Sequence, residues 1–380
     1  MTGQITSQVL LAGPDLAEPI LPLGINGEVA GLAACLRHAG VETSFEELMG
    51  VTATAFRTHF FRPRDNPGMP IGPVADNPGA LWSPRFAWSS LRHNNYGQAE
   101  SAAFYYGGEV RPIDGLDALE TWRLLRFELD AGRPIIAYGL GDPIAPDLII
   151  GYRLEKGPLR QIIVVQARQG QVEFDLTGRK PADEGPYPRE LLVVRPGAVV
   201  DYRGSDDARR VDALRWAANH TSTRRELVYE SERFYATGPF AFEALCEFLR
   251  DLAPDELANP IEGDPGDIAA TLTRFCAATL REWITARWAA SAYLKGWSRA
   301  LSRASRSPEG IAATPDGLDA LADLYRASAL ALAVASLQAP VLDDSGAAMA
   351  DADAREGLAK AVEAALIVER RALDLLCALI

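Results

Sequence analysis

Residues 26–50 read NGEVAGLAACLRHAGVETSFEELMG, and segment 29–36 of this stretch is entirely apolar. Small residues recur at helical spacing, with Ala30 and Ala34 one turn apart. Such a face allows close packing against another element. The stretch therefore predicts a buried helix from Gly27 to Gly40, in the core of an N-terminal domain.

Five short runs further along the chain predict strands. They are rich in β-branched and apolar residues and are bounded by Gly and Pro, at 135–138, 148–154, 161–167, 171–175 and 191–195. Their short spacing favours an antiparallel sheet. Two further helices are expected at 97–106 and 116–131, after a region rich in Pro and Gly at 62–84.

The C-terminal half has a different pattern. From Asp206 onward apolar residues recur at helical spacing, and the predicted helices lie at 206–220, 238–252, 266–305, 316–336 and 350–379. Short connections between several helices are typical of a bundle. We therefore expect an α+β protein of two domains, with an antiparallel sheet in residues 1–205 and an all-α helical bundle in residues 206–380.

The spacing in residues 26–50 resembles that of the papain-like cysteine peptidases and acyltransferases. It is most similar to the N-terminal family of butirosin biosynthesis protein H, in which a Cys, thirteen residues of helix, a Gly and a short IS-x-x-x-L-x-G stretch follow one another. The matching positions are Gly27, Ala30, Leu32, Ala33, Leu36, Arg37, His38, Gly40, Ser44, Leu48, Gly50 and Phe56. The resemblance covers roughly residues 15–200 and implies a papain-like N-terminal domain.

The catalytic groups of that family are missing from the matching positions. Gly27 stands where the nucleophilic Cys belongs, and the catalytic His would fall on Ala145, Pro146 or Asp147. Only the third group has a counterpart, since Asp175 matches the family's Asp or Asn. Cys35 lies eight residues along the same helix, about 12 Å from the expected position. We therefore predict no catalytic residues and favour a binding protein over an enzyme.

Helix N-termini bind anions and carbonyl groups through their free N–H groups, here expected on Glu28, Val29 and Ala30. The predicted function is thus a non-catalytic, papain-like protein that binds a small molecule or a protein partner, in a natural-product pathway as the resemblance implies. One alternative is a butirosin-type acyltransferase or amide hydrolase with displaced residues. Another is a homodimeric scaffold paired through the helix at 361–380. The candidate ligand-binding residues are Asn26, Gly27, Glu28, Trp82, Trp88, Asp147 and Asp175.

The net charge of the chain disfavours some classes of binding partner. The 380 residues carry a formal net charge of −13, which disfavours nucleic acids and anionic membranes as partners. The N-terminus lacks the basic start of a signal peptide, so we expect a cytoplasmic location. Four arginines, at 287, 299, 303 and 306, are expected on a solvated helix face. The four Cys and four His are scattered, which predicts no metal site and no cofactor.

Overall fold

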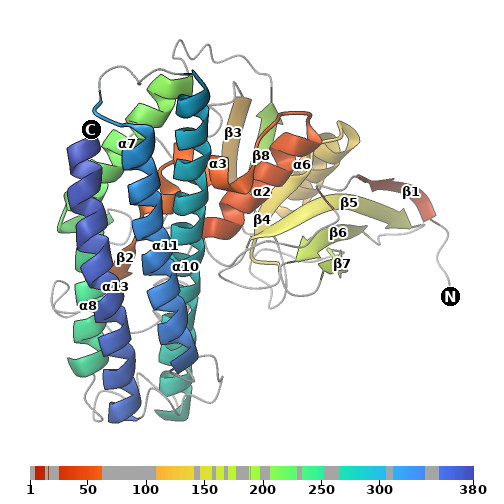
Figure 1. Cartoon of the computed structure of the whole chain (residues 1–380). Helices are drawn as coiled ribbons and strands as arrows, with labels where there is room; N and C mark the ends of the chain where they lie inside the picture. The colour runs from red at the N-terminus through yellow and green to blue at the C-terminus, as the bar shows by residue number, and fades with distance from the viewer. Residues whose placement is uncertain are drawn as a thin grey trace. The chain divides into compact units, whose positions relative to one another are not determined.

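The computed structural model describes residues 5–12, 16, 25–61, 108–140, 146–155, 160–166, 170–176, 188, 190–196, 206–228, 233–251, 265–304, 311–338 and 351–380. They form eight α-helices, one 3-10 helix and ten strands (Figure 1). Two compact units result, one of Met1–Leu48 with Asn95–Arg203 and one of Met49–Asn94 with Gly204–Ile380. The division at 203/204 lies close to the expected boundary at 205/206, whereas residues 49–61 group with the C-terminal unit.

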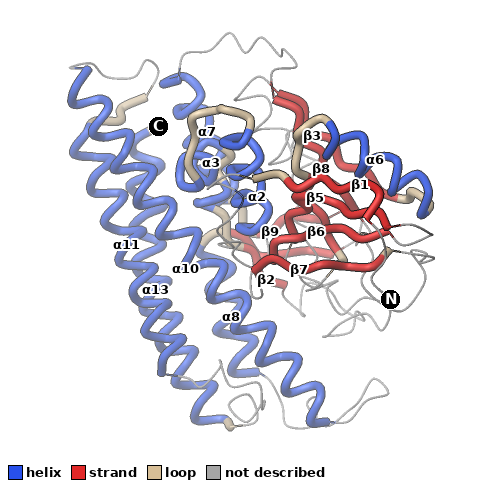
Figure 2. Tube along the Cα trace, turned by 90° about the vertical axis from the view of Figure 1, so that its right-hand side faces the viewer, coloured by secondary structure: helices blue, strands red, loops and turns tan. Residues whose placement is uncertain are grey.

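The first unit is built on a seven-stranded antiparallel sheet (Figure 2). Six strands follow the order β3 (Gly108–Asp114), β8 (Glu190–Pro196), β4 (Ile135–Tyr138), β5 (Asp147–Glu155), β6 (Arg160–Gln166) and β7 (Gly170–Asp175). The seventh, β1 (Ile5–Leu10), pairs with the second half of β5. The antiparallel sheet and all five predicted strands are confirmed, whereas β1 and β3 were not predicted.

Helices cover the two faces of this sheet. The helix α2 (Ile25–His38) packs against β4 and β8, and α6 (Ala118–Asp130) packs against β4 and β5. A Cβ atom added at Gly31 of α2 would lie 3.1 Å from the side chain of Ile136, so this face is tightly packed. Ile135 and Ala137 belong instead to the core that Trp122 of α6 shares. The prediction that the first helix packs against the sheet is confirmed.

The second unit is mainly helical. Its helices are α7 (Asp206–Ser222), α8 (Pro239–Asp251), α10 (Pro265–Ala304), α11 (Pro315–Gln338) and α13 (Ala352–Leu379). α10 packs against α11, α11 against α13, and α13 against α8. These contacts between neighbouring helices bury one apolar stripe of each helix. Trp283, Leu332 and Val362 lie in a common core.

This unit is not all-α, so that part of the predicted fold is wrong. A small antiparallel sheet joins β2 (His59–Phe61), β10 (Arg233–Thr237) and β9 (Arg225–Val228). Strands of three to five residues carry too little alternation to stand out in a sequence otherwise dominated by helical periodicity. The strand β2 comes from the N-terminal part of the chain and pairs with β10 about 175 residues later.

An ion pair lies in the interior of the helical unit. Arg287 of α10 is completely buried and donates from Nε and Nη2 to the two carboxylate oxygens of Glu369 on α13, at 2.6 and 2.9 Å. Ser328 of α11 donates to the same carboxylate at 2.5 Å. Arg287 also donates from Nη1 to the carbonyl oxygen of Ala55 at 2.8 Å. The expected solvated face is therefore wrong for Arg287, although Arg299 and Arg303 are exposed.

Aromatic rings pack the segment that Arg287 holds. Phe56 belongs to the short 3-10 helix η1 (Thr54–Phe56) and contacts the rings of Tyr293 and Tyr325, with centroids 6.4 and 5.4 Å away. Just before it, α3 (Phe45–Val51) brings Gly50 against Tyr293 so closely that a Cβ atom there would lie 2.1 Å from Cγ of the ring. Glycine is required at this position for the close approach.

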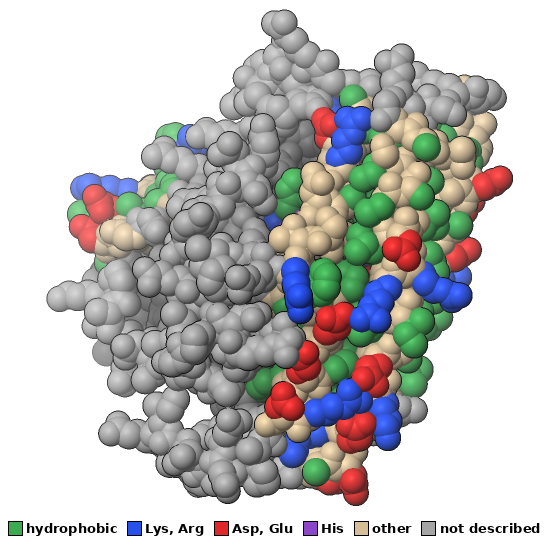
Figure 3. All heavy atoms as spheres, turned by 90° about the vertical axis from the view of Figure 1, so that its left-hand side faces the viewer, with side chains coloured by type: hydrophobic (Ala, Val, Ile, Leu, Met, Phe, Trp, Pro, Cys, Tyr) green, Lys and Arg blue, Asp and Glu red, His purple; other side chains and the backbone are tan. Residues whose placement is uncertain are grey.

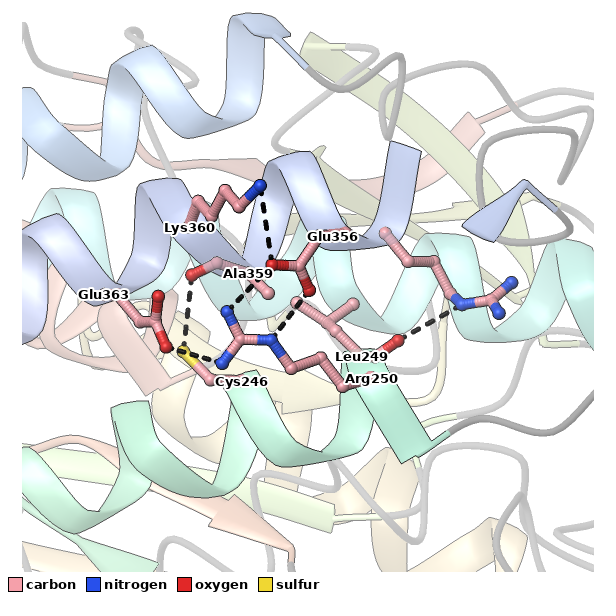
Figure 4. Close-up of polar contacts among 8 residues, drawn as sticks. Cys246, Leu249, Arg250, Glu356, Ala359, Lys360 and Glu363 are labelled. Atoms are coloured by element: carbon pink, nitrogen blue, oxygen red, sulfur yellow. Dashed lines mark hydrogen bonds and ion pairs between the residues drawn. The ribbon is translucent and has the colours of Figure 1, made fainter. Parts of the chain in front are cut away.

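On the face that Figure 3 shows, charges of both signs lie among hydrophobic side chains. Arg250 of α8 makes two hydrogen bonds with Glu356 of α13, at 2.7 and 3.1 Å, and one with Glu363, at 2.5 Å (Figure 4). Next to this network, Cys246 donates a weak bond to the carbonyl of Ala359 at 3.5 Å. These half-exposed ion pairs align α8 with α13 without needing to be buried.

The helices α11 and α13 concern two of the expectations about partners, a membrane and a second copy of the chain. α11 has an 18-residue window of mean hydropathy 1.4, long and apolar enough to cross a membrane by length and composition, and 39% of that window is buried. Core helices of globular proteins pass the same test, and α11 packs between α10 and α13. In α13, Leu358, Val362 and Leu366 pack inside the unit, while Ile367 is 59% exposed. Pairing of two copies through residues 361–380 stays a prediction.

We predict that Gly50→Ala destabilises the protein by about 3 kcal/mol, because the new methyl group must displace the buried ring of Tyr293. Gly296→Ala on α10 is the matched control. That helical glycine has no neighbouring atom within 4 Å of an added Cβ, so alanine there should stabilise by about 0.5–1 kcal/mol. Urea unfolding followed by circular dichroism measures both values, and equal effects would contradict the close approach at Gly50.

Replacing Arg287 by Met should cost about 3–5 kcal/mol of unfolding free energy, because it leaves the carboxylate of Glu369 buried without its partner. The double variant Arg287→Met/Glu369→Leu should recover a large part of that loss, since neither charge is then buried. Arg250→Met serves as control and should cost much less, because that ion pair is half-exposed. If the double variant is as unstable as the single one, the carbonyl bonds of Arg287 outweigh the ion pair.

Candidate functional site

The candidate site lies at the N-terminal end of α2, in the first unit. The helix begins at Ile25, two residues before Gly27, and both Gly27 and Glu28 are buried. The N–H groups of Val29 and Ala30 therefore lie inside the helix, where carbonyl groups of the first turn accept them. The N–H groups that face outward along the axis belong to the first residues of α2, not to Glu28, Val29 and Ala30 as expected.

Glu28 and Tyr138 form the central contact of this site. The hydroxyl group of Tyr138, the last residue of β4, donates to Oε2 of Glu28 at 2.5 Å. Both side chains are buried, at 2% and 7% exposure. Short bonds between a hydroxyl group and a carboxylate are among the strong hydrogen bonds in proteins. The positive end of the α2 dipole further favours an acidic side chain in the first turn.

Tyr138 was not singled out from the sequence. The residue ends an apolar strand, IIAY, and lies 110 positions from its partner Glu28. The available signal was a hydroxyl-bearing residue at the end of a predicted apolar strand. Buried polar side chains need a partner, which marks Tyr138 as a candidate, but its pairing with Glu28 requires the fold.

Asp147 is buried at the start of β5, but on the other side of the sheet. It lies opposite Ala137 in the register, and paired residues of antiparallel strands project to the same face. Ala137 belongs to the core covered by α6, whereas α2 covers the face of Ile136. The β5 residue on the α2 face is Leu148, opposite Ile136. Asp147 is therefore not placed beside Glu28 as a substitute for the catalytic His.

Asp175 lies at the far end of the sheet. In the register it pairs with Gln161, which pairs with Arg153. Arg153 is six residues beyond Asp147 along β5, which corresponds to about 20 Å at about 3.3 Å per residue. Asp175 is also exposed. Its position excludes the role of orienting a group at the N-terminus of α2.

The remaining predicted residues add little to this geometry. Asn26 is in the first turn of α2, and its side chain lies outside the described residues, as do Trp82, Trp88 and Ala145. Of the seven candidates, the structure thus brings together Gly27 and Glu28, with the backbone of Asn26 beside them. Tyr138 joins them as the residue that the sequence analysis missed.

Cys35 does not replace the missing nucleophile. It is buried in α2, and its thiol group contacts the carbonyl oxygen of Pro134 at 3.8 Å. Burial raises the pKa of this thiol to about 12, so the thiolate that attacks carbonyl groups is not formed near neutral pH. Cys246 and Cys276, in the second unit, have their pKa values raised to about 12 by burial as well.

Within the described ranges no group of three or more His, Cys, Asp or Glu side chains could hold a metal ion. His38 ends α2, about three turns away from Gly27. His59 and His220 lie together in the second unit, 4.8 Å apart between ring centroids. The chemistry that the site offers is a buried carboxylate and a phenol, which bind hydrogen-bonding groups and transfer protons but supply no thiolate.

Comparison with known proteins leaves the resemblance to papain-like proteins as a prediction. No model of a protein family matches this chain, and no curated protein matches it either.

We predict that iodoacetamide at pH 8 labels the native protein at Cys377 and leaves Cys35, Cys246 and Cys276 unmodified for hours. Cys377 is the exposed cysteine, whereas the other three are buried thiols with pKa values of about 12. Burial and then the nearby Asp374 raise the pKa of Cys377, so its labelling should be slow. Peptide mapping by mass spectrometry locates the adducts.

Two controls make this test decisive. Cys377→Ser should remove native labelling, and 6 M guanidinium chloride should expose all four cysteines of the wild-type chain. Labelling of Cys35 in the folded protein would show that the thiol is accessible and would reopen the possibility of displaced cysteine catalysis.

Proposed function

We propose that the first unit is a papain-like domain without cysteine chemistry, which binds a small molecule or a partner's polar group at the N-terminal end of α2. The observation that supports this proposal is the buried bond between Glu28 and Tyr138, next to the position of the lost nucleophile. The papain-like assignment and a role in a natural-product pathway come from the sequence resemblance and belong to the proposal.

The chemistry of this pair favours a particular class of ligand. A carboxylate accepts hydrogen bonds only, and a phenol both donates and accepts. A ligand that approaches Glu28 and Tyr138 therefore gains most from N–H or O–H groups, as in amines, amino alcohols and amides. This differs from the anion expected at a bare helix N-terminus, because an ionised Glu28 would repel a carboxylate ligand.

An acyltransferase or amide hydrolase with displaced residues has less support. Such an enzyme needs a nucleophile within reach of its base. In the described part of the first unit the cysteine is Cys35, which is buried and protonated. Glu28 and Tyr138 can move a proton, but they do not form the covalent intermediate of this reaction class. Binding without turnover is therefore the proposal that we favour.

The proposal predicts that amines or amides, screened at millimolar concentration, raise the melting temperature of the wild-type protein. A ligand at a hundred times its dissociation constant stabilises the native state by about 2.7 kcal/mol. Glu28→Gln and Tyr138→Phe should each weaken binding by about tenfold or more. The first variant removes the carboxylate acceptor, and the second removes the phenol hydroxyl group. Isothermal titration calorimetry measures the dissociation constants of the hits.

Asp175→Asn is the matched control for these variants. Asp175 is an acidic residue of the same sheet, exposed and at the opposite end, so its neutralisation should leave affinity unchanged. Hits that bind the Glu28→Gln protein as well as they bind the wild type would place the binding site elsewhere. Carboxylates that stabilise the protein better than amines would contradict the proposed ligand class.

A further inference from the structure

Four side chains of the second unit form one stack, here called the imidazole stack. The guanidinium of Arg57 lies over the ring of Trp216, 4.3 Å from its centroid. The other stacked neighbour of Trp216 is His220, with centroids 4.8 Å apart and planes within 10°. His59 follows, 4.8 Å from His220 and tilted by 54°. Two imidazole rings are thus held together by a cation and an indole.

The imidazole stack lies where three elements meet. Arg57 lies two residues before β2, and His59 is the first residue of that strand. Trp216 and His220 lie in the last turns of α7. β10 closes the junction, because Thr237 is paired with His59 and donates to the carbonyl oxygen of His220 at 3.2 Å. The contact between β2 and the end of α7 therefore runs through the two imidazoles.

Further bonds show how closely this junction is packed. Thr58 donates to the carbonyl oxygen of Gly238 at 3.0 Å, and the N–H of Gly238 donates back to Thr58 at 3.2 Å. Gly238 has a φ of 57°, and a Cβ atom there would lie 2.3 Å from the carbonyl oxygen of Thr221. There is little room for hydration of an added charge while the junction stays closed.

The electrostatic surroundings oppose protonation of His220. It is buried, and the groups that face it are Arg57, His59 and, from α10, Arg287, whose own charge is paired with Glu369. Burial first, and then these three basic groups, hold the pKa of His220 well below its usual value of about 6.5. An opened junction would let water reach the ring and would restore the usual value.

We propose that the stacked imidazoles of His59 and His220 make the contact between β2 and α7 acid-sensitive, so that the junction is closed near neutral pH and opens on acidification. In the closed state His220 stays unprotonated, whereas in the open state it takes up a proton as the pH falls through about 6.5. Protons therefore favour the open state at all pH values below about 6.5. Opening of this junction loosens segment 57–61, which belongs to the helical unit although it comes from the N-terminal part of the chain.

The size of the effect follows from proton linkage. For one group with a pKa of about 6.5 in the open state and far below that in the closed state, lowering the pH from 7.5 to 5.5 raises the opening equilibrium about tenfold. The opposite sign would require a group whose pKa is raised in the closed state. Proton release from His220 on closure thus predicts both the direction and the magnitude of the change.

Hydrogen exchange measured by mass spectrometry tests this proposal on the full chain at pH 7.5 and 5.5, after correction for intrinsic exchange rates. In the wild type, peptides that cover residues 57–61 and 216–224 should open about tenfold more at pH 5.5. In His220→Phe, which keeps a ring on Trp216 but cannot titrate, the change should be less than twofold. His38→Gln, at the end of α2, is the matched control and should behave as the wild type.

The proposal would be overturned by a wild-type junction whose protection does not change between the two pH values, or by an unchanged pH dependence in the folded His220→Phe protein. If His220→Phe does not fold, His220→Gln replaces it in the same comparison. Should neither fold, the wild type still decides, because a tenfold change confined to these peptides supports the imidazole stack and a uniform change over all peptides contradicts it.

Discussion

The ion pair between Arg287 and Glu369 organises the second unit. A buried charge is costly unless its partner and further hydrogen bonds compensate for lost hydration. Here the guanidinium makes four hydrogen bonds, two to the carboxylate oxygens of Glu369 and one each to the carbonyl oxygens of Ala55 and Arg57. One side chain thereby fixes two long helices and a segment from the N-terminal part of the chain. The position of residues 54–61 depends on this compensation.

The sequence predicted elements far better than it predicted which elements belong together. Strands such as β4 and β6 were found because local composition and turn residues define them. The grouping of residues 49–61 with the helices depends on contacts across more than 200 positions, such as that between Arg287 and Ala55. A lone arginine on a helix looks solvated in sequence, and nothing local indicates that a carboxylate 82 residues away will pair with it.

The residues of the site, too, were predicted only where the local sequence defines them. Gly27 and Glu28 were identified because they lie at the start of an apolar helix whose spacing is distinctive. Asp147 and Asp175 were chosen by position along the chain, and the register separates them because a strand residue can face only one side of its sheet. The same rule places Tyr138 on the face of α2, a result that requires knowing where β4 begins.

The two buried polar contacts differ in what they do for folding. Arg287 holds three parts of the unit together, so an apolar pair in its place would leave the carbonyl groups of Ala55 and Arg57 without that donor. Glu28 accepts a bond from Tyr138 at the end of β4, and its buried carboxylate has a desolvation cost that Leu or Ala would not have. The proposed recognition of a donor ligand would give this buried acid a role beyond its bond to Tyr138.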